Sequence, residues 1–339
     1  MDSIHVFYSS EIAEHQSADA FQALCESPAT SIITTACLGP FLPTQNNPNS
    51  TRLLSEIVPH LAYLRHLRVN LEERYYHGPQ WDTWVPPELS LTGFNTKIPC
   101  RLLTVANTKQ RSIAALLKRT PEVIALSLNR PLEDDWPCQH DAPDLPSLRR
   151  LELHHPWDEG ALILFEIVVV SCIRTLRSLF IPANMSNFAT LLSSAGPNQI
   201  TDLVLDFTFS GHYNIPKDQM VGMSSEVIGT CPRLRNLALR SAGSGANLGR
   251  LLDAVQYPLA SLDMLLSAGI PRERVPLPLV TAIQGANDEP HRALARLRVL
   301  AVNLQEAPDT ALKIVCAKRR IRFIQYKAAW PLLWCFDQL

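Results

Sequence analysis

A stretch of mixed acid, thiol and imidazole side chains, LEDDWPCQHDAPD (132–144), offers ligands of the kind that hold a divalent metal ion. These side chains belong to Asp134, Asp135, Cys138, His140 and Asp141. Protein metal sites usually combine two ligand pairs at fixed spacing, and no second pair of that kind occurs elsewhere in the chain. We therefore interpret the stretch as a solvated acidic insertion and expect no metal.

A second stretch, SAGSGANLGR (241–250), follows an expected strand and opens an expected helix, as a dinucleotide-binding loop does. Its glycines include Gly243, and Asp263 follows about twenty residues later, where such loops place an acid. The third glycine is one position too late for G-x-G-x-x-G, and no phosphate-binding lysine follows. We expect no cofactor. A nucleotide-dependent enzyme that uses the Gly243 loop is the weakest alternative.

A third stretch, LELHHPWDEG (151–160), ends a strand with His154, His155, Trp157 and Asp158. An exposed aromatic residue at such an edge is typical of a protein contact. Alternatively, Trp157 folds over the next helix and the acids cap the start of that helix. The chain lacks G-x-S-x-G and H-E-x-x-H, so no catalytic residue is assigned and no enzymatic activity is expected.

The composition limits the classes of partner. Lys and Arg number 31 against 32 Asp and Glu, so no overall positive charge attracts a nucleic acid or an anionic membrane. No two of the eight cysteines are separated by only two residues, which argues against a zinc or redox pair. We expect them to act as separate small apolar residues. The first residues, MDSIHVFYSSEIAE, do not form a secretory signal, and the apolar run 161–173 is too short to cross a membrane. We expect an intracellular protein, cytoplasmic or nuclear.

A short pattern recurs along the whole chain. In CPRLRNLALR (231–240) the large apolar residues are Leu234, Leu237 and Leu239, and the same three-then-two spacing recurs in about twelve units. Several units carry Arg after the first apolar residue: LRHLRV, LRRLEL, LRSLFI, LRVLAV and IRFIQY. Segments with helical spacing lie between the units, so strands and helices alternate; these segments are 111–119, 161–174, 187–195, 247–255 and 309–319. We expect the apolar run within 161–174 to be a buried helix, and the tenth unit to begin at Leu262. The last two apolar residues of a unit are expected to point into the interior from a short strand.

The unit CPRLRNLAL resembles the cysteine-containing leucine-rich repeat, with Cys231 at the position of the repeat cysteine. The resemblance implies an α/β fold, a right-handed solenoid with a concave parallel sheet and outer helices. It covers residues 1–327, with a capping segment at 328–339. The Asn that usually follows the strand is mostly missing, and the longer periods imply loop insertions.

Irregular repeats of this kind are similar to the recognition region of fungal F-box proteins. That resemblance implies a protein-recognition module, in a substrate-recognition part of a ubiquitin ligase, with an adaptor as partner if an F-box lies upstream. The F-box itself is not evident, since its nearest echo is LLSEIVPHL (53–61). A scaffold protein with no ubiquitin role is the alternative. We expect a monomer that binds a protein, and neither nucleic acid nor membrane, through residues of the concave face and its edge: His66, Arg68, Arg150, Glu152, His154, His155, Trp157, Asp158, Asp206 and Arg240.

Overall fold

The structure, a computed structural model, divides the chain into two compact units, Met1–Thr175 and Leu176–Leu339. It describes residues 3–6, 34–38, 63–70, 97–106, 110–129, 143–154, 162–185, 187–196, 198–208, 216–240, 245–265, 276–284, 289–303 and 310–326. Each unit is described by itself. The prediction of one solenoid over residues 1–327 stays a prediction. The cap at 328–339 and the F-box echo at 53–61 lie outside the described residues.

The first unit contains strands that follow one another in the sheet in the order of the sequence, and all neighbours are parallel. They are β1 (Ser3–Val6), β2 (Thr35–Leu38), β3 (His66–Asn70), β4 (Leu102–Ala106), β5 (Ala125–Asn129) and β6 (Arg150–His154). Helices α3 (Gln110–Arg119) and α4 (Leu162–Cys172) follow β4 and β6.

The second unit repeats this order, again with every pair of neighbouring strands parallel. Its strands are β7 (Ser178–Pro182), β8 (Asp202–Asp206), β9 (Asn236–Arg240), β10 (Ser261–Leu265), β11 (Val299–Asn303) and β12 (Arg322–Tyr326). Between them lie α5 (Phe188–Ser194), α6 (Lys217–Gly229), α7 (Gly245–Asp253), α8 (Pro276–Gln284), the 3-10 helix η7 (Glu289–Leu294) and α9 (Thr310–Lys318).

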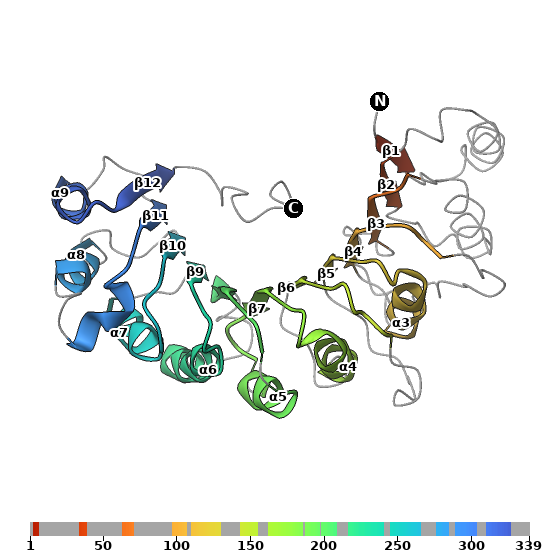
Figure 1. Ribbon diagram of the computed structural model, residues 1–339, viewed down its shortest axis with the longest axis horizontal. Coiled ribbons are helices and arrows are strands. Elements are labelled where there is room, and N and C mark those ends of the chain that lie inside the picture. The colour runs from red at the N-terminus through yellow and green to blue at the C-terminus, as the bar shows by residue number, and fades with distance from the viewer. Residues whose placement is uncertain are drawn as a thin grey trace, which may run out of the picture. The chain divides into compact units, whose positions relative to one another are not determined.

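The helices of the second unit lie together behind one face of its sheet (Figure 1). Consecutive helices contact one another, as α6 contacts α7 and α8 contacts α9. We call the opposite face, formed by the first, third and fifth residue of each strand, the helix-free face. Parallel strands joined through helices that stack on their neighbours form an α/β leucine-rich-repeat solenoid, so the predicted fold class is confirmed.

The strand periodicity explains the spacing of the apolar residues. Leu237 and Leu239 are fully buried on the helix side of β9, and their partners in register, Leu203 and Leu205 on β8, are buried as well. Leu234 reaches the same core from the turn before the strand. The predicted inward direction of the last two apolar residues is therefore confirmed.

One backbone contact recurs at the junctions between turns of the coil. The carbonyl of the residue before a strand accepts hydrogen bonds from two successive amides of the next turn. Arg235 O accepts from the amides of Ala260, at 2.7 Å, and Ser261, at 3.2 Å. Thr201 O accepts from Arg235 and Asn236 in the same way, at 2.8 and 3.0 Å. These paired bonds fix the register of one turn on the next.

Five predicted helical segments are confirmed as helices α3, α4, α5, α7 and α9. The predicted bounds are 111–119, 161–174, 187–195, 247–255 and 309–319. Helix α4 is the apolar run that we expected to be buried, and Leu164, Phe165 and Val168 are buried in it. Among the described residues, no helix has both the length and the apolar character needed to cross a membrane.

Two units are placed differently from the sequence pattern. The tenth begins at Leu259 rather than Leu262, because Leu262 pairs in register with Leu237 and is thus the second apolar residue of its turn. In β12 the register is shifted by one residue, so that Arg322 pairs with Val299. A shift of one residue exchanges the two faces of a strand, which places Gln325 in the interior row rather than on the helix-free face.

We expect Leu237→Asp to lower the free energy of unfolding by about 4 kcal/mol or more, because a carboxylate would enter the core shared by neighbouring turns. The measurement is chemical denaturation followed by circular dichroism. Ile314→Asp is the control, since Ile314 is 48% exposed on α9, and it should cost less than about 1 kcal/mol. Equal effects of the two changes would contradict the shared core.

Candidate functional site

Strand β6 separates its side chains between the two faces of the sheet. Leu151 and Leu153 are fully buried on the helix side. Arg150, Glu152 and His154 alternate with them and therefore lie on the helix-free face. The sequence predicted all three as contact residues, and the structure brings them together in one row.

The three side chains form a continuous chain of charged hydrogen bonds. Arg150 Nε and Nη2 donate to Glu152 Oε1 at 2.8 and 2.5 Å. His154 Nε2 lies 3.2 Å from Glu152 Oε2, and it must be the donor if the carboxylate is ionised. The side chains of Arg150, Glu152 and His154 are 16%, 11% and 33% exposed. Glu152 therefore positions its two neighbours, and His154 presents the largest share of its surface.

The environment of Glu152 favours its charged form. Burial, the largest influence, raises the pKa of its carboxyl, but the hydrogen bond from His154 and the charge of Arg150 together outweigh burial. The pKa of Glu152 consequently lies below its ordinary value of 4.5. An ionised Glu152 holds Arg150 and His154 in place near neutral pH.

The other predicted contacts of the first unit are placed less completely. His66 lies on β3 with its Nε2 3.2 Å from Thr104 Oγ1 on the neighbouring strand. The backbone of Arg68 belongs to β3, but its side chain is outside the described part of the structure. His155, Trp157 and Asp158 lie wholly outside it. The two interpretations of Trp157, contact residue or cover of a helix, therefore stay open.

In the second unit, Asp206 and Arg240 lie side by side at the ends of β8 and β9, where they pair in register. Arg240 Nη1 is 3.4 Å from Asp206 Oδ2. The amide and hydroxyl of Thr208 donate to Asp206 Oδ1 at 2.9 and 2.5 Å. The side chain of Asp206 is only 3% exposed, whereas that of Arg240 is 37% exposed. Arg240 is thus the accessible member of the pair.

A polar chain at the beginnings of three strands was not predicted. Asn236 Nδ2 donates to Asp202 Oδ1 at 2.5 Å, and Ser261 Oγ donates to Asn236 Oδ1 at 2.8 Å. Thr201 Oγ1 donates to Asp202 Oδ2 at 2.6 Å. All three strand residues occupy the first position of their strand, in register. Aligning the units by this position would have shown the row, whereas spacing along the chain does not.

The described cysteines have a structural role. Cys100, Cys172, Cys231 and Cys316 are free and buried. Burial, the main influence on each of them, raises the pKa of the thiols of Cys100, Cys172 and Cys231 to about 12 and that of Cys316 in the same direction. Protonated, buried thiols are poor nucleophiles and poor metal ligands, so these four act as small apolar residues, as the sequence predicted.

The other motifs receive little support from the described residues. Residues 132–142 and 241–244, including Gly243, lie outside them. Asp263 is buried in the middle of β10 rather than at the end of a strand, where a dinucleotide-binding acid would lie. Within the described part of the chain, no three His, Cys, Asp or Glu residues gather as a metal site would require.

Comparison with known proteins leaves the family open. No protein-family model and no curated protein matches the chain. Solved structures do match, and one is the crystal structure of a complex of TLR13 with ssRNA13, at 12% sequence identity and a TM-score of 0.21. The match covers 86% of this chain and 47% of that one, so the chain spans about half the length of TLR13. The fold assignment rests on the parallel strand register described above.

We expect Glu152→Gln to reduce the free energy of unfolding by about 1–3 kcal/mol near neutral pH, because Arg150 and His154 lose their charged acceptor. Folding lowers the pKa of this carboxyl, so its charged form stabilises the folded protein at pH values above the pKa that the carboxyl has in the unfolded chain. This stabilisation is lost as the pH falls through the pKa that it has in the folded protein. The difference between wild type and variant should therefore shrink as the pH falls below about 4.5. Urea denaturation at a series of pH values measures it.

Glu166→Gln is the control for that series, since Glu166 is exposed on α4 of the same unit. It should change stability by no more than about 0.5 kcal/mol at any pH. A Glu152→Gln difference that stays constant down to strongly acidic pH would show that the carboxylate is not held in its charged form.

Proposed function

We propose that the chain is a recognition module that binds another protein through the helix-free face of its sheets. The observation that carries this proposal is the row Arg150–Glu152–His154, three side chains of both charge signs locked to one another on that face. The pair Asp206–Arg240 repeats the arrangement in the second unit. Groups held in place before binding lose little conformational entropy when a partner docks, which favours a contact surface.

The mixed charge of this face favours a protein as the partner. Guanidinium, imidazole, amide and carboxylate groups alternate there, and such a pattern complements the mixed polar surface of a folded protein. A chain with a formal net charge of −1 supplies no general attraction for a polyanion.

Replacing His66, His154 and Arg240 with Ala should lower the yield of captured partner on the order of tenfold, because each residue is partly exposed on the helix-free face. Affinity capture from cell extract with quantitative mass spectrometry measures the loss. The control replaces exposed helix residues, Glu166, Arg250 and Lys313, with Ala and should leave capture unchanged. Thermal melting confirms that both variants fold. Equal capture by all three proteins would exclude this face as the interface.

The same affinity-capture experiment distinguishes two more specific forms of the proposal, a ubiquitin-ligase role and a scaffold role. Co-purification of a ubiquitin-ligase adaptor and a cullin with the wild type would support a substrate-recognition role of the F-box type. Capture of a partner without those subunits would instead support a scaffold with no ubiquitin role. The resemblance of the repeats supports the first form, and the structure of the fold is equally compatible with the second. A nucleotide-dependent role predicts a thermal shift with NAD or ATP.

A further inference from the structure

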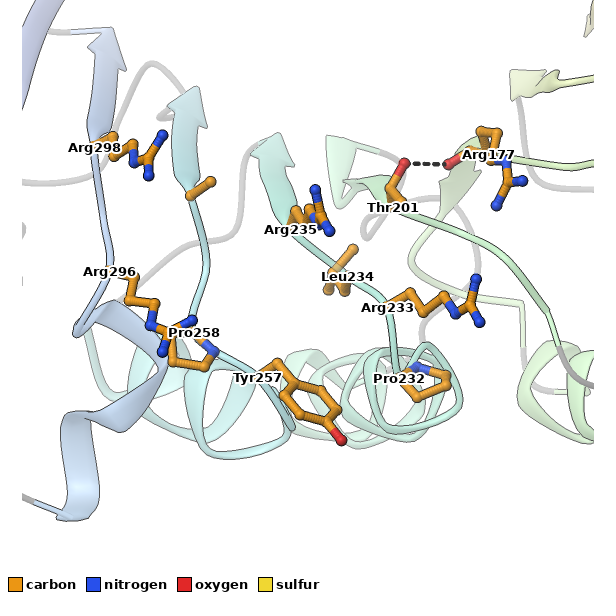
Figure 2. A pocket seen from close by; sticks show the side chains of 11 residues that line it. Arg177, Thr201, Pro232, Arg233, Leu234, Arg235, Tyr257, Pro258, Arg296 and Arg298 are labelled. Atoms are coloured by element: carbon orange, nitrogen blue, oxygen red, sulfur yellow. Dashed lines mark hydrogen bonds between the residues drawn. The ribbon is translucent and has the colours of Figure 1, made fainter.

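A cleft of about 820 Å³ opens at the beginnings of the strands of the second unit (Figure 2). It is lined by residues that directly precede strands and by the turns before them. The lining residues are Arg177, Thr201, Pro232, Arg233, Leu234, Arg235, Tyr257, Pro258, Ala260, Arg296 and Arg298. We call it the arginine cleft, because five of these are arginines and none carries a carboxylate.

The repeat places the arginines in this cleft. Arg177, Arg235 and Arg298 follow the first apolar residue of their units and lie immediately before β7, β9 and β11. Arg233 and Arg296 come two residues before Arg235 and Arg298. Arg233 and Arg296 lie in the turns before β9 and β11, and all four arginines line the cleft, so each of these two turns contributes two guanidinium groups.

The positive charge of the cleft is not balanced by the surrounding described residues. The Gln199 side-chain oxygen accepts hydrogen bonds from Arg177, at 3.1 Å, and from Arg233. This neutral amide holds two guanidinium groups near each other without cancelling their charge. In the described part of the chain, none of the five arginines forms an ion pair with a carboxylate. Like charges gathered in this way repel one another, and an anionic ligand relieves that repulsion.

The floor of the cleft is rigid. Arg177 O accepts the amides of Thr201 and Asp202 at 2.8 and 3.1 Å, and it lies 3.3 Å from the Thr201 hydroxyl oxygen (Figure 2). Arg235 O accepts the amides of Ala260 and Ser261. The ring of Tyr257, which is 61% exposed, and the neighbouring Pro258 form an apolar rim. A fixed backbone with an exposed aromatic residue beside it is suited to binding an extended chain.

The distance over which the arginines are distributed distinguishes between classes of anionic ligand. Arg177 and Arg298 lie at opposite ends of the view in Figure 2, before β7 and β11. Four strand spacings amount to about 19 Å, which an extended peptide spans with about six residues. Charges distributed over that length match several carboxylates in a row better than one compact phosphate group.

We propose that the arginine cleft binds an extended acidic segment, rich in Asp and Glu, of the protein partner. The proposal rests on the proposed recognition function and gives it a second, chemically defined contact. A guanidinium group can donate two parallel hydrogen bonds to one carboxylate. The segment would lie across the beginnings of the strands, with its apolar residues against Tyr257.

The test is fluorescence anisotropy with the whole chain and a labelled peptide of about eight residues that alternates Glu and Ala, which is long enough to cover the span of about six residues across the cleft. We expect binding that weakens as salt is added, and at least about tenfold weaker binding of the matched Gln–Ala peptide. Arg235→Gln combined with Arg298→Gln should weaken binding of the Glu peptide at least about tenfold. Thermal melting shows whether this variant is folded.

The matched control is Arg65→Gln combined with Arg101→Gln, which changes exposed arginines at the same repeat position in the first unit. It should alter peptide affinity less than about twofold, because neither residue lines the cleft. Equal losses in the two variants, or equal affinity for the Glu and Gln peptides, would overturn the proposal. Tighter binding of single-stranded oligouridine, or of a singly phosphorylated peptide, through the same arginines would overturn it too.

The peptide assay is independent of partner capture, so the two proposals fail separately. The variant with His66, His154 and Arg240 changed to Ala should bind the Glu peptide as the wild type does. If the peptide does not bind while that variant still loses its partner, only the arginine cleft is excluded. If the peptide binds as expected and that variant captures its partner normally, the helix-free face is excluded as the interface.

Discussion

The described structure depends on a backbone contact that recurs before most strands: the carbonyl of the residue that precedes the strand accepts two successive amides of the next turn. It occurs in both units: Arg65 O accepts from Arg101 and Leu102, and Arg177 O accepts from Thr201 and Asp202. Because the acceptor is a backbone atom, the contact fixes the position without restricting its side chain. Thr201 and Ala260 fill that position in other turns and make the same two bonds. The fold therefore does not require arginine there, and the arginines that do occupy it are free to serve the surface.

The last turn shows the consequence of changing this contact. Arg298 O accepts the amide of Arg322 at 2.8 Å, while the preceding amide, that of Ile321, bonds to Cys316 O instead. Arg320 has a φ of 56°, a left-handed conformation that non-glycine residues seldom adopt. The strand that follows is shifted by one residue, and the interior row continues from Val302 to Gln325. Loss of one of the paired bonds thus accompanies an exchange of the two faces of the strand.

The sequence predicted those features that depend on local periodicity. Inward leucines such as Leu237 follow from spacing alone, and five helices with clear apolar stripes were found. Helix α6 was not singled out, since it contains Gly222, Gly229 and several polar residues, and α8 begins with prolines in its first turn. The start of the tenth unit was misplaced because Leu259, Leu262 and Leu265 all fit a spacing of three, and only pairing with β9 distinguishes them. Ion pairs such as Asp206–Arg240 likewise depend on which residues of neighbouring strands lie opposite one another. The spacing of residues along the sequence does not contain that information.

The exposure of the side chains on the helix-free face also differs along each strand, and this shows which of them a partner can reach. The third residues of the strands face away from the helices, yet Glu152, Val204 and Ala238 are buried there, since neighbouring strands about 4.8 Å apart bring their side chains into contact. First residues such as Asp202, Asn236 and Ser261 remain partly exposed. In the second unit this accessible polar row directly follows three residues that line the cleft, Thr201, Arg235 and Ala260. A partner that contacts both would meet carboxamide, hydroxyl and carboxylate groups next to guanidinium groups, so it needs an acidic segment beside a neutral polar surface. This combination is more restrictive than a basic patch alone, and under the arginine-cleft proposal it would allow a chain with almost no net charge to select an acidic partner.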